Sequence, residues 1–371
     1  MKHVFVFLLF VISAANGSAQ VKVEDFRSKP GLSSDWHVIQ AALCYVDSLG
    51  HGTLEFEGTR TYKINRSLEL PRYSKRGSRI IILNGNGCRI EAKKDTISVF
   101  RRIPKDQNEA LNKMMSTRIH LNDFVISGGR KAIDLGATYS SSINRCMFEN
   151  QKAAAVDIQF GLQTEINHCQ VINNHNDGFV IRTGEEWGGS ANNSQSNHTV
   201  LRSCRVYARK NGNGASVRIL GSSGVVIDDF ISEGGNNEYA VYVDVQRSTT
   251  VRMLTLRNLH IEHIPEKCGI YLRSTGISKI DGIFYQLARP DWPLIYVPGG
   301  IQQVVLSNIP HFVTGTILKH DTDAAWELDN VHEKFLNPEN WRSRNREGNY
   351  VKKPPFFSKG EGYLYQQKQK L

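Results

Sequence analysis

The chain has 371 residues, of which 40% are hydrophobic, and it carries 46 Lys and Arg against 36 Asp and Glu, a formal net charge of +10. This hydrophobic content is enough for a continuous core. After the N-terminal segment, no stretch reaches the ~18 uninterrupted apolar residues of a transmembrane helix. No recognised nucleic-acid-binding motif accompanies the positive charge. We therefore expect neither membrane insertion nor a nucleic-acid partner.

The first nineteen residues have the pattern of a secretory signal. Lys2 precedes an apolar run from Val4 to Ile12, and Gly17-Ser18-Ala19 forms a small-residue cleavage site. The run is too short to span a bilayer. Retention as an anchor is the alternative, but cleavage is favoured. We expect residues 1–19 to be removed and the protein to be secreted or periplasmic.

The segment after the signal resembles the opening of a known family. Val23-Glu-Asp-Phe-Arg-Ser-Lys-Pro-Gly31 precedes Asp35-Trp-His-Val-Ile-Gln-Ala-Ala-Leu43, and then come Gly52-Thr-Leu-Glu-Phe56 and Thr61-Tyr-Lys-Ile64. This order is similar to the N-terminus of the pectate-lyase-like β-helix superfamily, notably its rhamnogalacturonase and epimerase-like branch and phage tailspikes. The family prefers Gly where this chain has Arg27 and Pro where it has Glu57. The resemblance implies the fold, but that superfamily holds lyases, hydrolases, epimerases and inert binders.

The same segment predicts a helical cap. Ser34 can cap a helix from about Asp35 to Ser48, and Gly50 follows its end. An apolar face suited to covering an open end of β-structure is formed by Ile39, Ala42, Leu43 and Val46.

An apolar residue followed after two positions by Cys, Phe, Leu or Ile recurs along the chain. The repeats start at Ile119 (where Leu121 is the residue in register and precedes Phe124 after two positions), Ile143, Ile166, Leu201, Ile227, Leu256 and Ile280. Subtraction gives steps of 24, 23, 35, 26, 29 and 24 residues. Periods of ~20–50 residues indicate a solenoid.

A second signature, a small or apolar residue followed by apolar-x-apolar, runs in phase with the first. It begins at Ala132, Ala155, Gly178, Ser216, Ala240, Gly269 and Leu294. Such short period-two alternation is typical of strands, and a repeat of ~25 residues leaves no room for a crossover helix. The pattern of leucine-rich repeats is missing. We therefore predict a right-handed parallel β-helix (all-β) over residues 20–335 with an N-terminal helix cap, followed by a basic C-terminal tail, 336–371.

The sequence contains six cysteines. Cys146, Cys169 and Cys204 occupy one position of successive repeats, so we expect them to stack inside the core as small apolar residues. A disulfide among them is the alternative. Metal binding is disfavoured because no CxxC pair accompanies them.

The x positions of the second signature point out of the core and should form one column. That column reads Asp134, Asp157, Val180, Arg218, Tyr242, Tyr271 and Tyr296, and a second outward column contains Arg182, Asp244 and Arg273. Tyrosine rings can stack on sugars and arginine forks can hold carboxylates. A basic exported protein with such a face is expected to bind an acidic polysaccharide. The alternative is ordinary exposed sheet.

The 35-residue step contains the largest insertion, directly after Arg182. It includes Glu185 and Trp187 between glycines. Long loops on a rigid scaffold often carry function, so Trp187 is a candidate sugar platform. Alternatively, Trp187 holds the loop against the coil.

Two reactions fit these residues. In an elimination, Arg182, Arg218 or Arg273 would neutralise a uronate carboxylate, Tyr242 or an arginine would remove the adjacent proton, and Asp134 with Asp157 could hold Ca²⁺. In a hydrolysis, Asp134 and Asp157 would lie at the ~5–5.5 Å of retaining enzymes, and Glu185 or Asp244 could complete a wider pair. The hydrolase branch of the resembled family carries a Gly-His-Gly motif, which in this chain occurs just after the predicted cap helix, at Gly50-His51-Gly52, and not in the repeats. We favour a polysaccharide lyase, with glycoside hydrolysis or non-catalytic glycan binding as alternatives.

Overall fold

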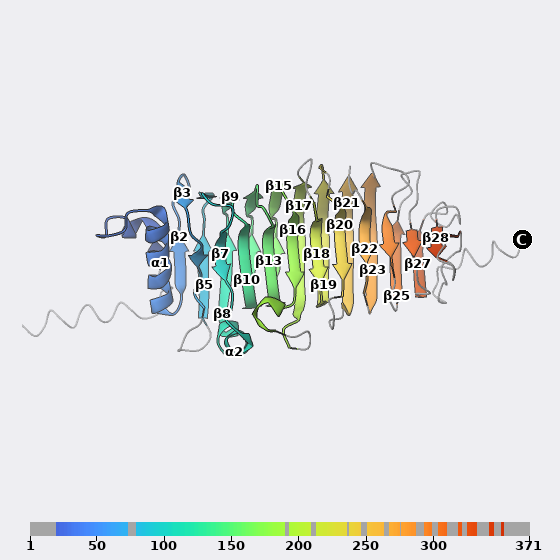
Figure 1. Ribbon diagram of the computed structural model, residues 1–371, viewed down its shortest axis with the longest axis horizontal. Helices are drawn as coiled ribbons and strands as arrows, with labels where there is room; N and C mark the ends of the chain where they lie inside the picture. Colours follow the sequence, from blue (N-terminus) through green and yellow to red (C-terminus); the bar gives the residue numbers. More distant parts are fainter. Residues whose placement is uncertain are drawn as a thin grey trace, which may run out of the picture.

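The computed structural model describes residues 20–72, 79–189, 193–208, 213–235, 237–245, 251–262, 267–274, 276–286, 293–298 and 303–309, with the backbone of four later strands. It confirms the predicted parallel β-helix. Strands that are distant in the chain stack side by side along one long axis (Figure 1). In this part of the chain, no helix is long and apolar enough to cross a bilayer. The predicted signal lies outside the described residues.

Three parallel sheets form the walls of the solenoid. Sheet 1 contains β4 (Leu68–Glu69), β7 (Ser98–Arg102), β10 (Lys131–Tyr139), β13 (Ala154–Leu162), β16 (Asp177–Arg182), β18 (Ala215–Leu220), β20 (Tyr239–Asp244), β22 (Cys268–Leu272), β24 (Ile295–Val297), β26 (Leu318–His320) and β28 (Trp341–Arg344). Sheet 2 contains β1 (Gln20–Lys22), β2 (Gly52–Glu55), β5 (Arg79–Asn84), β8 (Thr117–Asn122), β11 (Ser142–Asn144), β14 (Glu165–Asn167), the first halves of β17 (Ser196–Ala208), β19 (Ser222–Glu233), β21 (Met253–Glu262) and β23 (Ile277–Gln286), then β25 (Gln303–Ile309) and β27 (Ala325–Val331). Sheet 3 contains β3 (Thr61–Ile64), β6 (Arg89–Ala92), β9 (Val125–Ser127), β12 (Met147–Glu149), β15 (Gln170–Asn174) and the second halves of β17, β19, β21 and β23.

β28 and the antiparallel β29 (Tyr350–Val351) lie in the segment predicted as a basic tail. The rest of residues 336–371 is outside the described part of the chain, so the predicted boundary at 335 stays a prediction.

The corner between sheets 2 and 3 explains the first sequence signature. Its third position adopts a left-handed backbone in successive coils, at Asp123, Arg145, His168, Ser203, Asp229, Asn258, Gly282 and Asn308. The aliphatic residue before this corner and the Cys, Phe, Leu or Ile after it both point into the core. One left-handed residue per coil thus turns the chain while keeping both neighbours inside.

The cysteine stack is confirmed. Cys146, Cys169 and Cys204 are free and buried, and they lie beneath one another just after this corner. Burial raises the pKa of the Cys146 and Cys169 thiols well above the usual value. These thiols therefore act as small core residues.

The predicted cap is also confirmed. Helix α1 (Asp35–Leu49) starts after Ser34, whose side chain accepts a hydrogen bond from the His37 amide, and ends at Gly50 with φ of 85°. Its buried face includes Ile39, Ala42 and Leu43. Figure 1 shows α1 (blue) across the first coil at one end of the stack.

Candidate functional site

Sheet 1 carries the outward column predicted from the sequence. The register pairs Asp134 with Asp157, Asp157 with Val180, and Val180 with Arg218. It continues from Arg218 through Tyr242, Tyr271 and Tyr296. The inner neighbours, from Ile133 to Ile295, stack in the same register. The predicted alignment of this column is therefore correct.

Two excursions cover the N-terminal half of this face, so the column is not one continuous open groove. One contains α2 (Gln107–Asn112) and the 3-10 turn η3 (Met114–Ser116), and the other contains the turn η4 (Glu185–Trp187). They bury the outward residues of β10 and β13, leaving Asp134 6% and Asp157 3% exposed. An open pair of carboxylates, as expected from the sequence, is therefore not present here.

A small apolar cluster fixes these excursions to the sheet. Trp187 packs against Phe160, with ring centroids 6.1 Å apart, and lies in one cluster with Ala110, Met114 and Ala137. Ala137 and Phe160 have left-handed backbones, with φ of 51° and 59°, in adjacent coils. Strained residues of this kind persist where surrounding contacts enforce them.

Close approach of the chain explains two glycines beside this cluster. A Cβ on Gly184 would collide with the Trp187 ring, and one on Gly136 would lie 2.7 Å from Pro104 Cδ. Trp187 is only 5% exposed, so it holds the loop against the coil, which is the second of the two roles considered for it. Glu185 lies on the same turn and is exposed.

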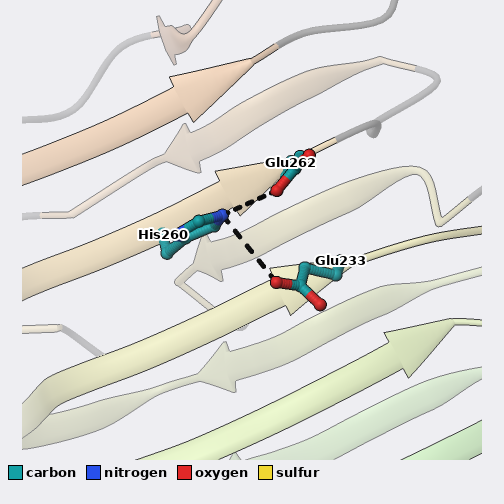
Figure 2. A group of neighbouring side chains, drawn as sticks. All are labelled: Glu233, His260 and Glu262. Carbon is teal, nitrogen blue, oxygen red and sulfur yellow. Dashed lines mark hydrogen bonds and ion pairs between the residues drawn. The ribbon is translucent and has the colours of Figure 1, made fainter.

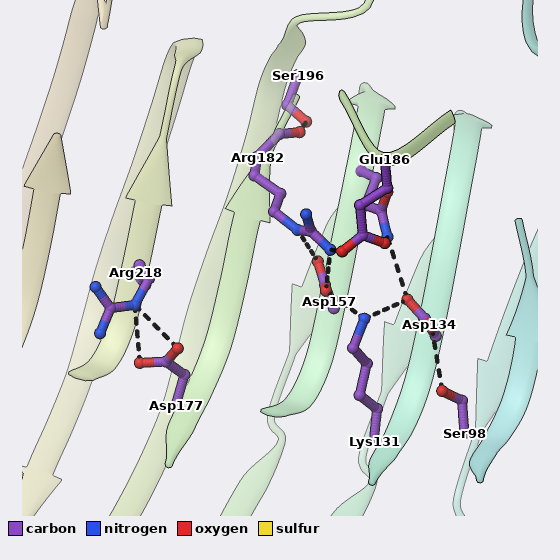
Figure 3. A network of polar contacts seen from close by, with 10 residues as sticks. Ser98, Lys131, Asp134, Asp157, Asp177, Arg182, Glu186, Ser196 and Arg218 are labelled. Carbon is purple, nitrogen blue, oxygen red and sulfur yellow. Dashed lines mark hydrogen bonds and ion pairs between the residues drawn. The ribbon is translucent and has the colours of Figure 1, made fainter. Parts of the chain in front are cut away.

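Beneath the loop lies a network of charged side chains (Figure 3). Lys131 Nζ is 2.9 Å from Asp134 Oδ1 and 2.6 Å from Asp157 Oδ2. Arg182 donates from Nε and Nη2 to the two oxygens of Asp157 at 2.9 and 2.8 Å, and from Nη2 to Glu186 at 2.6 Å. The network connects β10, β13 and β16 with the loop.

Neutral side chains complete this network. Gln159 Nε2 donates to Glu186 Oε2 at 3.1 Å and to Asp134 Oδ1 at 3.4 Å, and Ser98 Oγ donates to Asp134 Oδ2 at 3.1 Å. Asp134 and Asp157 therefore have partners on both carboxylate oxygens.

Electrostatics keeps Asp157, Arg182 and Glu186 ionised. Burial alone would raise the pKa of Asp157, but the hydrogen bonds and charges of Arg182 and Lys131 outweigh it and lower that pKa. Glu186 behaves similarly, because Arg182 outweighs burial and lowers its pKa. The same carboxylates raise the pKa of Arg182 although burial opposes the change. An acid that must deliver a proton near neutral pH needs a raised pKa, so Asp157 is poorly suited to that role.

The Ca²⁺ site expected at Asp134 and Asp157 does not fit these side chains. Lys131 Nζ bridges the two carboxylates. Calcium needs six to eight oxygen ligands at about 2.3–2.6 Å, and an ammonium group excludes a cation from the same position. We derive no step through a metal here.

Among the described residues, the C-terminal half of the face is open and carries a row of Arg and Tyr side chains. The Arg218 guanidinium lies 4.6 Å from the Tyr242 ring centroid. The Tyr242 and Tyr271 rings stack with centroids 4.7 Å apart and planes at 9°, and Tyr296 meets Tyr271 edge-on at 5.6 Å. These side chains are half-buried. We call Arg218, Tyr242, Tyr271 and Tyr296 the Arg–Tyr row.

The rings in this row cover one another's faces, which changes the expected mode of sugar contact. Arg218 lies over one side of Tyr242 and Tyr271 over the other. The row therefore offers hydroxyl groups, ring edges and guanidinium nitrogens more than open ring faces. Tyr239 joins the cluster at 4.9 Å from Tyr242.

Carboxylates fix the polar groups of this half. Arg218 Nε lies 2.9 Å from both oxygens of Asp177. The Tyr242 hydroxyl donates to Asp244 at 2.9 Å, and Arg273 lies 3.6 Å from the same carboxylate. Burial and this hydrogen bond raise the pKa of Tyr242, so the phenol is a weak acid and keeps its proton at neutral pH.

The structure thus divides the predicted residues into two groups. Asp134, Asp157 and Arg182 lie in the buried network, and Glu185 and Trp187 lie on the loop above it. The remaining predicted residues share the open half of the face, namely Arg218, Tyr242, Asp244, Tyr271, Arg273 and Tyr296.

Lys131, Asp177 and Tyr239 belong to these clusters but were missed in the sequence. Each begins a strand of sheet 1, followed by a small residue such as Ala132 and then the first core residue. The register skips that small residue, pairing Lys131 with Ala154 and Ile133 with Val156. Strict alternation of inward and outward side chains therefore fails at the small residue. The signal in the sequence for Lys131, Asp177 and Tyr239 was their position directly before the small residue of each repeat.

Comparison with known proteins supports the fold alone. No protein-family model and no curated protein matches this sequence. Among solved structures, the catalytic domain of Agl-KA aligns over 93% of this chain and 69% of its own, with a TM-score of 0.54 and 11% identity. A mutant tailspike protein of E. coli bacteriophage HK620, in complex with a pentasaccharide, aligns over 84% of this chain and 65% of its own, with a TM-score of 0.52 and 13% identity. This chain thus spans about two thirds of the tailspike's length.

Proposed function

We propose that this chain is an exported protein of the pectate-lyase-like superfamily that binds an acidic polysaccharide along the open half of sheet 1. The observation that carries the proposal is the Arg–Tyr row. It places hydroxyl and guanidinium groups at the spacing of successive coils, on the part of the face that the excursions leave uncovered. Arginine forks and tyrosine hydroxyls recognise carboxylates and sugar hydroxyls.

Three further observations support this proposal. The chain carries a net charge of +10, which attracts anionic polymers. The similar tailspike was solved with a pentasaccharide, so the same architecture can hold a glycan in that protein. Arg273 adds an outward guanidinium, with about half of its side chain (51%) in solvent.

Binding should be measured by affinity electrophoresis or calorimetry on uronate polymers and on a neutral polymer of matched length. Arg218→Ala removes a charge-assisted donor and Tyr271→Ala removes the centre of the stack, so each should weaken binding about tenfold or more. Affinity for the uronate polymer should fall as salt rises.

The chain offers matched controls. Arg257 forms a similar two-point pair with Asp228 on sheet 2, and Tyr45 is exposed on α1. Arg257→Ala and Tyr45→Ala should bind like the unmodified protein. If Arg218→Ala and Tyr271→Ala also bind unchanged, or if neutral polymers bind equally well, the proposed face is wrong.

Elimination is the second candidate, favoured by Arg218 over the Tyr242 ring and by Arg273 beside Asp244, the carboxylate that the Tyr242 hydroxyl binds. Arg218 or Arg273 would neutralise the uronate carboxylate, and Tyr242, its phenolic proton passed to Asp244, would remove the proton on the carbon beside that carboxylate. A carbon–carbon double bond would form as the bond to the leaving sugar oxygen breaks, and that oxygen would take a proton from water. The measurement is ultraviolet absorbance of unsaturated ends on the same polymers. Tyr242→Phe should abolish that signal and retain binding. Binding without absorbance or new reducing ends identifies a non-catalytic binder.

A further inference from the structure

A second cluster of polar side chains lies on sheet 3, away from the sheet 1 face. Its members come from neighbouring strands, with Glu233 at the end of β19 and His260 and Glu262 at the end of β21 (Figure 2). Glu233 and Glu262 are register partners, and His260 precedes Glu262 by two residues on the same side of the strand. The β-helix therefore aligns all three side chains outward.

The ligand atoms of these residues converge. His260 Nε2 donates to Glu262 Oε2 at 2.9 Å and lies 3.8 Å from Glu233 Oε1. One ligand atom from each residue lies within 4.8 Å of the others. In a tetrahedral zinc site with bonds of about 2.0–2.2 Å, the donor atoms are about 3.3 Å apart. The two measured distances lie on either side of that value, so small rotamer adjustments would suffice.

Neighbouring side chains contact and orient Glu233 and His260, as the neighbours of metal ligands usually do. The Tyr207 hydroxyl hydrogen-bonds Glu233 from the preceding coil, which orients that carboxylate. The Phe284 ring lies 4.5 Å from the imidazole on the other side. The side chains of His260, Glu233 and Glu262 are 34%, 18% and 28% exposed, so an ion held between them could also bind water.

We propose that Glu233, His260 and Glu262 form a binding site for a divalent transition-metal ion that links two successive coils. One imidazole nitrogen and two carboxylate oxygens suit Zn²⁺, whereas Ca²⁺ requires six to eight oxygen ligands. The two carboxylates balance the charge of the ion. Three protein ligands leave a fourth position for water or an exogenous ligand.

Calorimetry with ZnCl₂ at pH 7.5 on the full chain without a histidine tag tests this proposal. The exposed Cys44 thiol could also bind zinc, so every protein carries Cys44→Ser. One ion should bind per chain with micromolar affinity. Glu233→Gln and Glu262→Gln preserve shape but weaken the ligand, and each should reduce affinity tenfold or more. His260→Gln should abolish binding.

Two controls keep the result specific. Glu165→Gln changes an exposed glutamate on sheet 2, and His198→Asn changes an exposed histidine at a left-handed position that Asn tolerates. Both should bind zinc normally. Binding of Co²⁺ should produce visible absorption bands of a four-coordinate ion in the Cys44→Ser parent protein and not in its His260→Gln variant.

Zinc should also raise the melting temperature of the Cys44→Ser parent protein, because the ion binds only the folded site. Absence of stoichiometric binding, or equal binding by the Glu→Gln variants, would show that the cluster is only a hydrogen-bonded His–Glu pair beside a second carboxylate. None of these readouts depends on polysaccharide binding.

Discussion

At the scale of single residues, Arg102 is the most completely buried charged side chain of the described part of the chain. Its guanidinium donates to the backbone carbonyls of Pro71, Arg72, Gly136, Ala137 and Met114. Burial lowers the pKa of Arg102 to about 9. One side chain thus ties the excursion containing η3 to two coils of sheet 1.

We expect Arg102→Lys to destabilise the protein by about 3 kcal/mol, because a single ammonium cannot reach all of these carbonyls and leaves several buried without a donor. Urea unfolding measures the change. The matched control is Arg101→Lys, since Arg101 is exposed beside Glu69 and should contribute less than about 1 kcal/mol. Equal effects of the two variants would contradict the role of Arg102.

Asp157 makes stability depend on pH. Its lowered pKa means that its contribution is fully present above its ordinary value of 3.8 and is lost as pH falls through the lower value of the folded protein. At pH 7, Asp157→Asn should cost about 3 kcal/mol, because Lys131 and Arg182 lose a buried counter-charge.

Urea unfolding between pH 2.5 and pH 7 measures this dependence for both proteins. The difference between them should shrink only below about pH 4. Asp95→Asn, at an exposed aspartate, serves as the control. A difference that stays constant to pH 2.5 would mean that folding does not lower the pKa of Asp157.

At the scale of elements, the corner between sheets 2 and 3 determines how each coil closes. The residue before the corner adds a ladder of side chains along the stack. Asn122 donates to Asn84, Asn144 to Asn122, and Asn167 to Asn144. In later coils, the same column alternates in charge through Arg202, Asp228, Arg257 and Asp281. Each coil thus satisfies the polar group of the one before it.

Gly282 is the corner residue of β23, with φ of 72°. Gly282→Ala should destabilise the protein by about 1–2 kcal/mol, since a Cβ disfavours the left-handed region. Gly282→Asn is the matched variant and should cost clearly less, because Asn tolerates this conformation and stands at the preceding corner, Asn258. Thermal unfolding of the two variants decides the point. If both variants lose a similar amount of stability, the loss comes from crowding of the new side chain and not from the left-handed backbone conformation.

At the scale of the whole molecule, the stack has an end that must be closed. Each coil buries its apolar interior against its neighbours, and the first coil has no preceding one. Helix α1 covers that end, with Val38, Ile39 and Val46 completely buried. An uncovered terminal coil would offer unpaired backbone groups to other chains.

Leu43→Asp places a charge in this covered interface and should detach the helix. We expect the protein to self-associate, detected by size-exclusion chromatography with light scattering. Tyr45→Asp, on the exposed side of α1, should elute like the unmodified protein. Circular dichroism checks that the strands persist in both. A Leu43→Asp protein that stays folded without a change of oligomeric state would show that α1 is not required as a cap.

The sequence alone determined the repeat, the cap and the alignment of the outward column. Ile133, Val156 and Phe179 recur in phase and point into the core. Because side chains alternate between the two faces of a strand, their polar neighbours must all point outward once the coils stack. The cap at Ser34 and Gly50 depends on local hydrogen bonds and backbone preference, which neighbouring residues specify. These features are local or periodic, so the linear sequence is enough to predict them.

Only the tertiary structure decided which part of the column is open. The cover over Asp134 and Asp157 comes from two segments inserted elsewhere in the chain, whose contacts with Phe160 and Gly136 follow no repeat. Lys131 bridges the carboxylates because an extra residue at the start of the strand breaks the alternation. Burial and charge pairing depend on distances between remote segments, and the order of residues along the chain does not specify those distances.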